Sequence, residues 1–178
     1  MRSPLLTTTG GLTHLHLMGI PRSAYFPPGY LLTRLSLLSQ LEMLWISFRS
    51  PVPNRDVIRQ LSEIPTMTHV TLPNLRMFIF SGVSAYLEGL LERITAPVLR
   101  ILHVRLFNQL TFAFPQLSQF LQTSQNLTFH TFELDFRRDR LHLFATSHQE
   151  NRKPLELLVS CNHFDWQVVC ATQILQTL

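Results

Sequence analysis

Charged residues are scarce in this chain of 178 residues, because Asp, Glu, Lys and Arg together make up 15% of it while hydrophobic residues make up 46%. This composition excludes a disordered protein and predicts a globular one with an apolar core. The formal net charge is +4, and the basic residues are scattered apart from one group at Arg137, Arg138 and Arg140. Nucleic-acid binding needs a basic stripe or face, so the sequence predicts no nucleic-acid partner.

Cysteine is scarce as well, and two cysteines exclude a disulfide scaffold. Residues 7–11 read Thr-Thr-Thr-Gly-Gly, which interrupts any apolar segment of a signal peptide. No apolar run approaches the ~20 residues that a membrane-spanning helix requires. The sequence therefore predicts an intracellular protein, in the cytoplasm or nucleus, with no membrane partner.

Motifs of known enzyme classes are missing: there is no Gly-rich phosphate loop, no paired-carboxylate motif and no His-Glu-x-x-His. Cys161, His163 and Asp165 lie within five residues, so a thiol hydrolase with Cys161 as nucleophile is an alternative. Such a thiol needs a base that reaches it in space and an oxyanion pocket, and proximity in sequence does not provide this geometry. We therefore predict no enzyme and no cofactor, and interpret Cys161 and Cys170 as core residues.

Three histidines are candidate metal ligands. His14 and His16 share one face of a predicted strand, and His103 lies on the same face two repeats away. Three imidazoles bind zinc only when they converge, whereas two strands at ~4.8 Å each would separate His16 from His103. We therefore predict surface histidines and no metal site.

What the chain does contain is a repeated apolar pattern, Leu-x-x-Leu-x-Leu with conservative apolar replacements. Successive copies begin 24 to 34 residues apart, at Leu12, Leu41, Leu75, Leu99 and Phe129. Self-similarity at this period is typical of a solenoid of the leucine-rich-repeat type. In such a protein the function lies on a surface built from many repeats.

The segments around the pattern complete a strand–loop–helix unit. Each copy alternates as a half-buried strand does, and helices are predicted over residues 30–38, 54–64, 84–94, 116–124 and 164–175. Further strands are predicted over 66–72, 141–145 and 155–161, the last two flanking a polar turn from His148 to Lys153. The predicted fold is an α/β leucine-rich-repeat solenoid, a horseshoe-type parallel sheet with outer helices, with five or six irregular repeats; 155–161 is the sixth.

Neither end of this pattern has a capping element, which a solenoid needs to cover its terminal apolar surface. We expect residues 1–178 to form a single leucine-rich-repeat domain that is a fragment of a longer solenoid. Self-association that covers both ends is the alternative.

Alternation along each strand assigns the outward side chains, because the leucines of the pattern point into the core. The predicted outward residues are His14, His16, Met18, Met43, Trp45, Ser47, Met77, Ile79, Ser81, Ile101, His103, Arg105, Thr131, Glu133 and Asp135. A contiguous apolar and aromatic patch of this kind indicates protein binding, unless a loop or a flanking segment covers it. The predicted partner-binding residues on this concave face are His16, Met43, Trp45, Met77, Ile79, His103 and Arg105.

Longer stretches resemble the repeat region of fungal F-box-like proteins. The similar segments are residues 65–94, Leu12-Thr-His-Leu with Ile20-Pro21, Ala96-Pro-Val-Leu, Phe107-Asn-Gln-Leu110, and Cys161 through Asp165-Trp166-Gln167. The resemblance covers nearly the whole chain, and the order and spacing of these motifs carry it.

The resemblance implies leucine-rich repeats that hold a protein substrate, and an F-box that docks on the adaptor of a cullin-type ubiquitin ligase. No F-box precedes Leu12 in this sequence, so the adaptor is a partner only if an F-box lies upstream of Met1. The family implies no catalytic residues. We predict a protein-binding module, the substrate-recognition part of an F-box-type ubiquitin-ligase subunit; a truncated structural fragment without a partner is the alternative.

Overall fold

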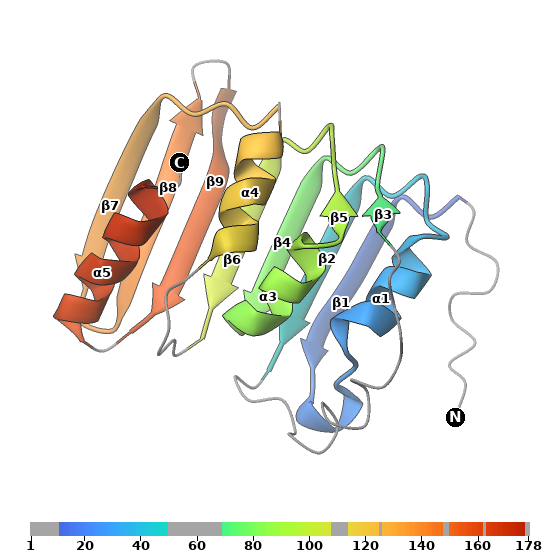
Figure 1. Ribbon diagram of the computed structural model, residues 1–178, viewed down its shortest axis with the longest axis horizontal. Coiled ribbons are helices and arrows are strands. Elements are labelled where there is room, and N and C mark those ends of the chain that lie inside the picture. Colours follow the sequence, from blue (N-terminus) through green and yellow to red (C-terminus); the bar gives the residue numbers. More distant parts are fainter. Residues whose placement is uncertain are drawn as a thin grey trace.

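The computed structural model describes residues 11–49, 69–107, 114–124, 126–147, 150–161 and 163–176. Its centre is a seven-stranded sheet with α-helices on one face, so the fold is mixed α/β (Figure 1). Across the sheet the strands are β1 (His14–Ile20), β2 (Met43–Phe48), β4 (Met77–Gly82), β6 (Ile101–Leu106), β9 (Glu150–Ser160), β8 (Arg140–Ser147) and β7 (Thr131–Arg137). The first five are parallel, and β8 is antiparallel to both of its neighbours.

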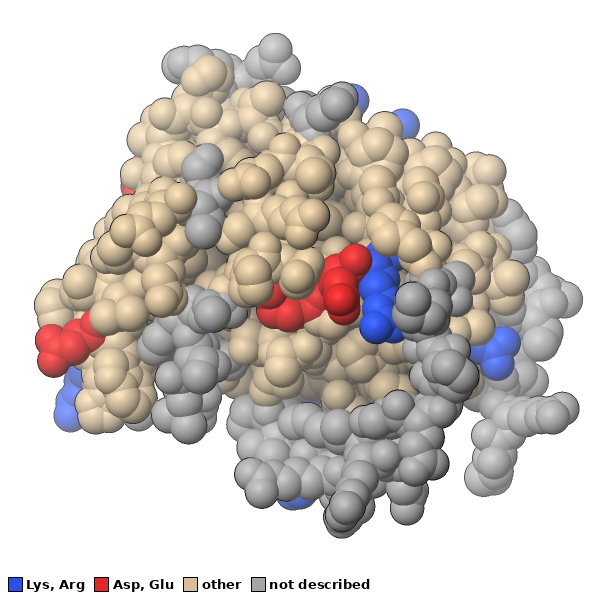
Figure 2. All heavy atoms as spheres, viewed as in Figure 1, with Lys and Arg blue, Asp and Glu red and all other residues tan. Residues whose placement is uncertain are grey.

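The helices form a layer in which α3 packs between α1 and α4, while α5 covers β7 and β8 (Figure 1). The elements on this side are the short 3-10 helix η2 (Arg22–Ala24), α1 (Pro28–Leu35), α3 (Ser84–Leu91), α4 (Pro115–Thr123) and α5 (Phe164–Leu175). A separate two-stranded parallel sheet joins β3 (Val70–Thr71) to β5 (Ile94–Thr95). Figure 2 shows that uncharged residues dominate this face, with a small mixed group of acidic and basic side chains beside α3.

The apolar pattern of the sequence forms the core between sheet and helices. Leu15, Leu44, Phe78, Leu102 and Leu155 stand opposite one another across five parallel strands, and all five are buried. Because side chains alternate along a strand, the residues between them point to the other face of the sheet. The predicted inward residues of the second, third and fourth repeat strands are confirmed as buried, whereas Leu12 and Leu17 of the first are only partly buried against this core.

Most of the described helices lie close to their predicted ranges, and α5 has the predicted bounds. Helix α3 ends at Leu91 rather than at Ile94, because Ile94 and Thr95 pair with Val70 and Thr71 as strand β5. Of the strand predicted over 66–72, the described residues form the short β3, and residues 66–68 lie outside the described part of the chain. The helix predicted over 54–64 lies outside the described residues.

One part of the predicted strand order is wrong. The repeat period predicts the fifth copy of the pattern beside the fourth, but this copy forms β7 at the far edge of the sheet, and β9 pairs with β6 instead. Strand β9 also begins at Glu150, inside the predicted polar turn of 148–153. Three closely spaced strands, β7, β8 and β9, therefore return as an antiparallel meander toward β6.

Side-chain composition gives the physical reason for this order. Strand β9 carries Leu155, Leu157, Leu158 and Val159, which suit a position buried between neighbours on both sides. Strand β7 reads Thr-Phe-Glu-Leu-Asp-Phe-Arg, and its side chains are largely exposed or half-buried. Charged side chains are favoured on edge strands because they oppose pairing with another chain.

The N-terminus of α4 is capped by a side chain from α3. The N-cap residue Phe114 makes no side-chain capping bond, and Pro115 occupies the first turn. The Glu88 carboxylate instead accepts hydrogen bonds from the backbone N–H of Gln116 (2.8 Å) and Leu117 (3.1 Å). These N–H groups have no partner within the helix, and a negative charge at this end also interacts favourably with the helix dipole.

We expect Glu88→Ala to lower the free energy of unfolding by about 1–2 kcal/mol, as the loss of a helix cap typically does. Glu88→Gln keeps an acceptor oxygen and should lose less. Denaturant unfolding followed by circular dichroism measures both, with the exposed Glu92→Ala as the matched control. Equal stability of Glu88→Ala and the parent would contradict the capping role.

The same carboxyl gives stability a pH dependence. Burial raises the pKa of Glu88 from its usual 4.5, and the two backbone hydrogen bonds oppose this effect without overcoming it. A raised pKa in the folded state means that the folded protein binds more protons, so this contribution is full below about pH 4.5 and is lost as the pH rises through the folded-state pKa. Glu88→Gln should remove this fall in stability, which unfolding curves across that range would show.

Candidate protein-binding face

The face of the sheet opposite the helices carries most of the predicted site residues in one row. His16, Trp45, Ile79 and His103 stand opposite one another on β1, β2, β4 and β6, and Glu156 of β9 continues the row. We call this side of the sheet the open face. The parallel register thus brings together four residues that lie far apart in the sequence.

The other three predicted residues lie in the two flanking rows. Met43 and Met77 stand side by side between His14 and Ile101, and Arg105 follows Ser47 and Ser81 in the row on the other side. All seven predicted residues therefore share the open face. Met43, Trp45, Met77, Ile79 and His103 are half-buried, whereas His16 and Arg105 are exposed.

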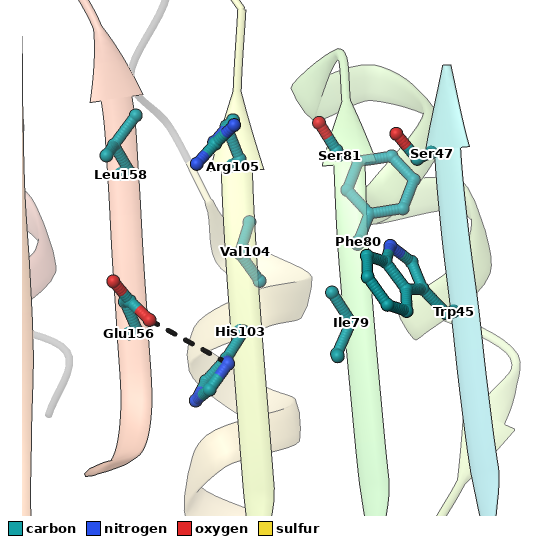
Figure 3. Close-up of a pocket in the computed structure, with 10 residues that line it drawn as sticks. All are labelled: Trp45, Ser47, Ile79, Phe80, Ser81, His103, Val104, Arg105, Glu156 and Leu158. Carbon is teal, nitrogen blue, oxygen red and sulfur yellow. Dashed lines mark ion pairs between the residues drawn. The ribbon is translucent and has the colours of Figure 1, made fainter. Parts of the chain in front are cut away.

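A cavity of about 310 Å³ opens on this face between β2 and β9. Figure 3 shows the indole of Trp45 beside Ile79, with the side chains of His103, Arg105 and Glu156 across from it. The lining residues are Trp45, Ser47, Ile79, Phe80, Ser81, His103, Val104, Arg105, Glu156 and Leu158. The cavity combines an aromatic wall, two hydroxyl groups and two oppositely charged side chains.

At the β1 end of the row, His16 holds the neighbouring side chains in place. Its ring lies edge-on to Trp45 with 5.6 Å between the ring centroids, and its Nε2 lies 3.1 Å from Sδ of Met43. His14 is next to it, with 6.5 Å between the two imidazole centroids. These contacts restrict the rotamers of Trp45 and Met43, so less side-chain entropy is lost when a partner binds.

Glu156 is the site residue that the sequence did not identify. Its Oε2 lies 3.7 Å from Nδ1 of His103, and its Oε1 lies 2.8 Å from Nε2 of His142 on β8. His103 also approaches the backbone carbonyl of Lys153, at 3.1 Å from Nε2. The available signal was the alternation of Leu155, Leu157 and Val159, which points Glu156 outward, but the neighbour of β6 could not be recognised from this pattern alone.

Arg105 differs from Glu156 because the described residues give it no ion-pair partner. The guanidinium stands in the same row as the hydroxyl groups of Ser47 and Ser81, with Leu158 on its other side. Figure 3 places its side chain at the cavity wall. The arrangement provides an exposed hydrogen-bonding cation next to an apolar wall.

The cysteine constellation lies at the end of β9 and the start of α5. Cys161 is buried, and its Sγ lies 3.4 Å from the backbone carbonyl oxygen of His163. The His163 ring packs against Trp166, with 4.8 Å between the ring centroids. Burial first, and the neighbouring Cys161 second, raise the pKa of the Cys170 thiol to about 12, so Cys170 behaves as a small core residue.

The three histidines considered as ligands do not converge, because Trp45 and Ile79 stand between His16 and His103 in their row. In the described ranges no group of three His, Cys, Asp or Glu side chains is arranged to hold a metal ion. No helix in the part of the chain that the structure describes has both the length and the hydropathy to cross a membrane.

Comparisons with protein-family models, with curated proteins and with solved structures found no match to this chain. The functional argument therefore starts from the geometry of the open face.

Proposed function

We propose that this chain is a leucine-rich-repeat module that binds a protein substrate on the open face, as the recognition part of an F-box-type ubiquitin-ligase subunit. The observation that carries the binding proposal is the unbroken row of His16, Trp45, Ile79 and His103 across four parallel strands. Ubiquitin transfer itself would take place on other subunits.

The chain order of the sheet supports the repeat assignment. Strands β1, β2, β4 and β6 are neighbours in the order in which the chain makes them, and α1, α3 and α4 follow β1, β4 and β6 on the same side of the sheet. Right-handed, parallel strand–helix units that stack on their neighbours are the organisation of a solenoid. The meander of β7, β8 and β9 is then an irregular extension of the stack beyond β6.

The chemistry of the open face supports binding to a protein. Met43, Trp45, Met77 and Ile79 form an adjoining block of large side chains that are only half-buried, and polar residues border it at His14, His103 and Arg105. An apolar, Met- and Trp-containing centre with a polar border is typical of protein–protein interfaces, in which a few central residues supply most of the free energy.

Trp45→Ala is expected to weaken binding by about 2 kcal/mol or more, because truncation of a central Trp removes a hot spot. Binders selected from a displayed protein library would be titrated against the parent, Trp45→Ala and His103→Ala by biolayer interferometry. Trp166→Ala is the matched control, since Trp166 is exposed on α5 and lies outside the open face. Its affinity should equal that of the parent.

Two results would contradict the binding proposal. One is unchanged affinity in both Trp45→Ala and His103→Ala; the other is loss of cooperative unfolding in these variants, which would make the residues part of the core. The ligase assignment has a separate test in the transcript upstream of Met1. An in-frame F-box there supports it, whereas a stop codon directly before Met1 removes it and leaves a binding module.

A further inference from the structure

The cavity on the open face contains two charged groups, and only one of them has side-chain partners among the described residues. Glu156 is flanked by two imidazoles, His103 at 3.7 Å and His142 at 2.8 Å. Arg105 lines the same cavity and is exposed, and the described residues place no carboxylate within ion-pair distance of it. The charged group of the cavity that lacks such a partner is therefore the Arg105 guanidinium.

The surroundings of Arg105 fit an anion that carries an apolar neighbour. Ser81 and Ser47 stand in the same row on β4 and β2, so the backbones that carry these two hydroxyl donors lie one and two strand spacings from that of Arg105, roughly 5 and 10 Å. Trp45 and Ile79 form the adjoining wall (Figure 3). Guanidinium groups form paired hydrogen bonds with carboxylates, and an aromatic wall supplies the contact area beside them.

We propose that this cavity binds the carboxylate of an Asp or Glu side chain in an internal segment of the partner protein, with Arg105 as the recognising group and Trp45 as the platform for a neighbouring apolar residue. This proposal rests on the function proposed above and specifies the chemistry of the bound segment.

A carboxylate fits the cavity better than a phosphate. The single guanidinium matches one negative charge, whereas a phosphate group on a side chain carries nearly two at neutral pH. Glu156 lines the same cavity, and its carboxylate repels a dianion more strongly than a monoanion. The charge balance therefore favours a single carboxylate.

An internal segment fits better than a chain terminus because the cavity lies in the middle of the sheet. Strand β1 lies beyond its Trp45 side, and β8 and β7 lie beyond its Glu156 side. The outward residues continue on both sides, with His16 and Met43 on one and Phe144 on the other. A bound chain can thus extend in both directions across the strands.

The test uses the full chain and arrays of amidated peptides of about twelve residues, each made with Glu, Gln, Lys or phosphoserine near an apolar residue. Affinities are measured by fluorescence anisotropy of dye-labelled peptides, so that Trp45→Ala is measured in the same way as the parent. Glu peptides should bind at least about tenfold more tightly than their Gln counterparts, as expected for a charged hydrogen-bond pair. Arg105→Gln should abolish this difference, and Arg34→Gln, on helix α1, should keep it.

Reversing the charge of residue 105 should create a preference for Lys peptides. A misfolded variant would lose binding and would not gain a new preference. Arg105→Glu should prefer Lys peptides over Glu peptides by a similar factor of about ten.

Equal binding of Glu and Gln peptides, still weakened by Trp45→Ala, overturns the carboxylate proposal and leaves the proposed function intact. Preference for phosphoserine, or for peptides with a free C-terminal carboxylate, also overturns it. Peptide binding that is insensitive to Trp45→Ala, in any array, removes both proposals.

Discussion

Leu102→Asp is expected to abolish cooperative folding of this protein. Leu102 is fully buried in the middle strand of the sheet, in the row formed by Leu15, Leu44, Phe78 and Leu155. A carboxylate there would have no described charge partner, and burying an unpaired charge costs more than most single interactions can offset. The typical stability of a domain is only about 5–15 kcal/mol, so the loss approaches the whole.

The neighbouring residue provides a matched control for this prediction. Ile101 is adjacent in the same strand but half-exposed on the open face. Ile101→Asp introduces the same side chain into the same strand, and we expect it to cost about 1 kcal/mol, within the range of strand propensities. Near-UV circular dichroism and urea unfolding distinguish the two variants. If both unfold like the parent, or both fail to fold, the assignment of the two sheet faces is wrong.

Which residues of the first strands face the core and which face outward could be predicted from the sequence, because the cause is local. Side chains alternate along a strand with period two, so the pattern around Leu44, Phe78 and Leu102 fixes which residues are buried as soon as the segments are strands. The same alternation placed Trp45, Ile79 and His103 on one face, and the parallel register then aligned them in one row.

The order of the strands beyond β6 is not determined by the local alternation of side chains. Which strand pairs with β6 depends on long-range competition between β7 and β9, and both have an alternating pattern. The repeat period favoured β7, but the apolar residues on both faces of β9, including Leu157 and Leu158, favour the more buried place. Glu156 was missed for this reason, because its position beside His103 follows only from the pairing of β9 with β6.

The layer of helices covers one face of the sheet, and this explains why the opposite, open face is the surface proposed to bind a partner. On the helix side the aromatic residues Phe48, Phe80 and Tyr86 fill the space between the sheet and α3 and are buried. On the opposite side Trp45 is half-buried, although it lies on β2, the strand that also carries Phe48, beside β4, which carries Phe80. The same strands therefore have one face that is filled by packing and one whose large side chains remain available for a partner.

Phe80→Ala is expected to lower the free energy of unfolding by about 3–5 kcal/mol, the usual loss for a large aromatic residue in a core. The Phe80 ring is buried and stacks on Tyr86 at 5.9 Å between centroids and 16° between planes. It also meets Phe48 edge-on at 6.3 Å. Its removal leaves a cavity beside two rigid rings, which limits relaxation around the site.

Gly82 supplies the test of this packing, because a methyl group at that position would occupy the space that the Phe80 ring fills. A Cβ on Gly82 would lie 2.7 Å from Cζ of Phe80 and 3.0 Å from Cδ2 of Phe48. Gly82→Ala alone should cost about 1–3 kcal/mol through overpacking. In the Phe80→Ala background the same methyl group enters the new cavity, so its cost should fall and can change sign.

Chemical denaturation of the two single variants and the double variant measures this coupling, with Gly89→Ala as the control. Gly89 lies in helix α3, where a Cβ would meet only the Pro28 ring at 3.4 Å, so alanine should stabilise the protein by about 0.5–1 kcal/mol in either background. Strict additivity of Gly82→Ala and Phe80→Ala would mean that the ring does not fill this space. A coupling confined to Gly82 identifies the aromatic cluster as the contact that sets the spacing between β4 and its helix layer.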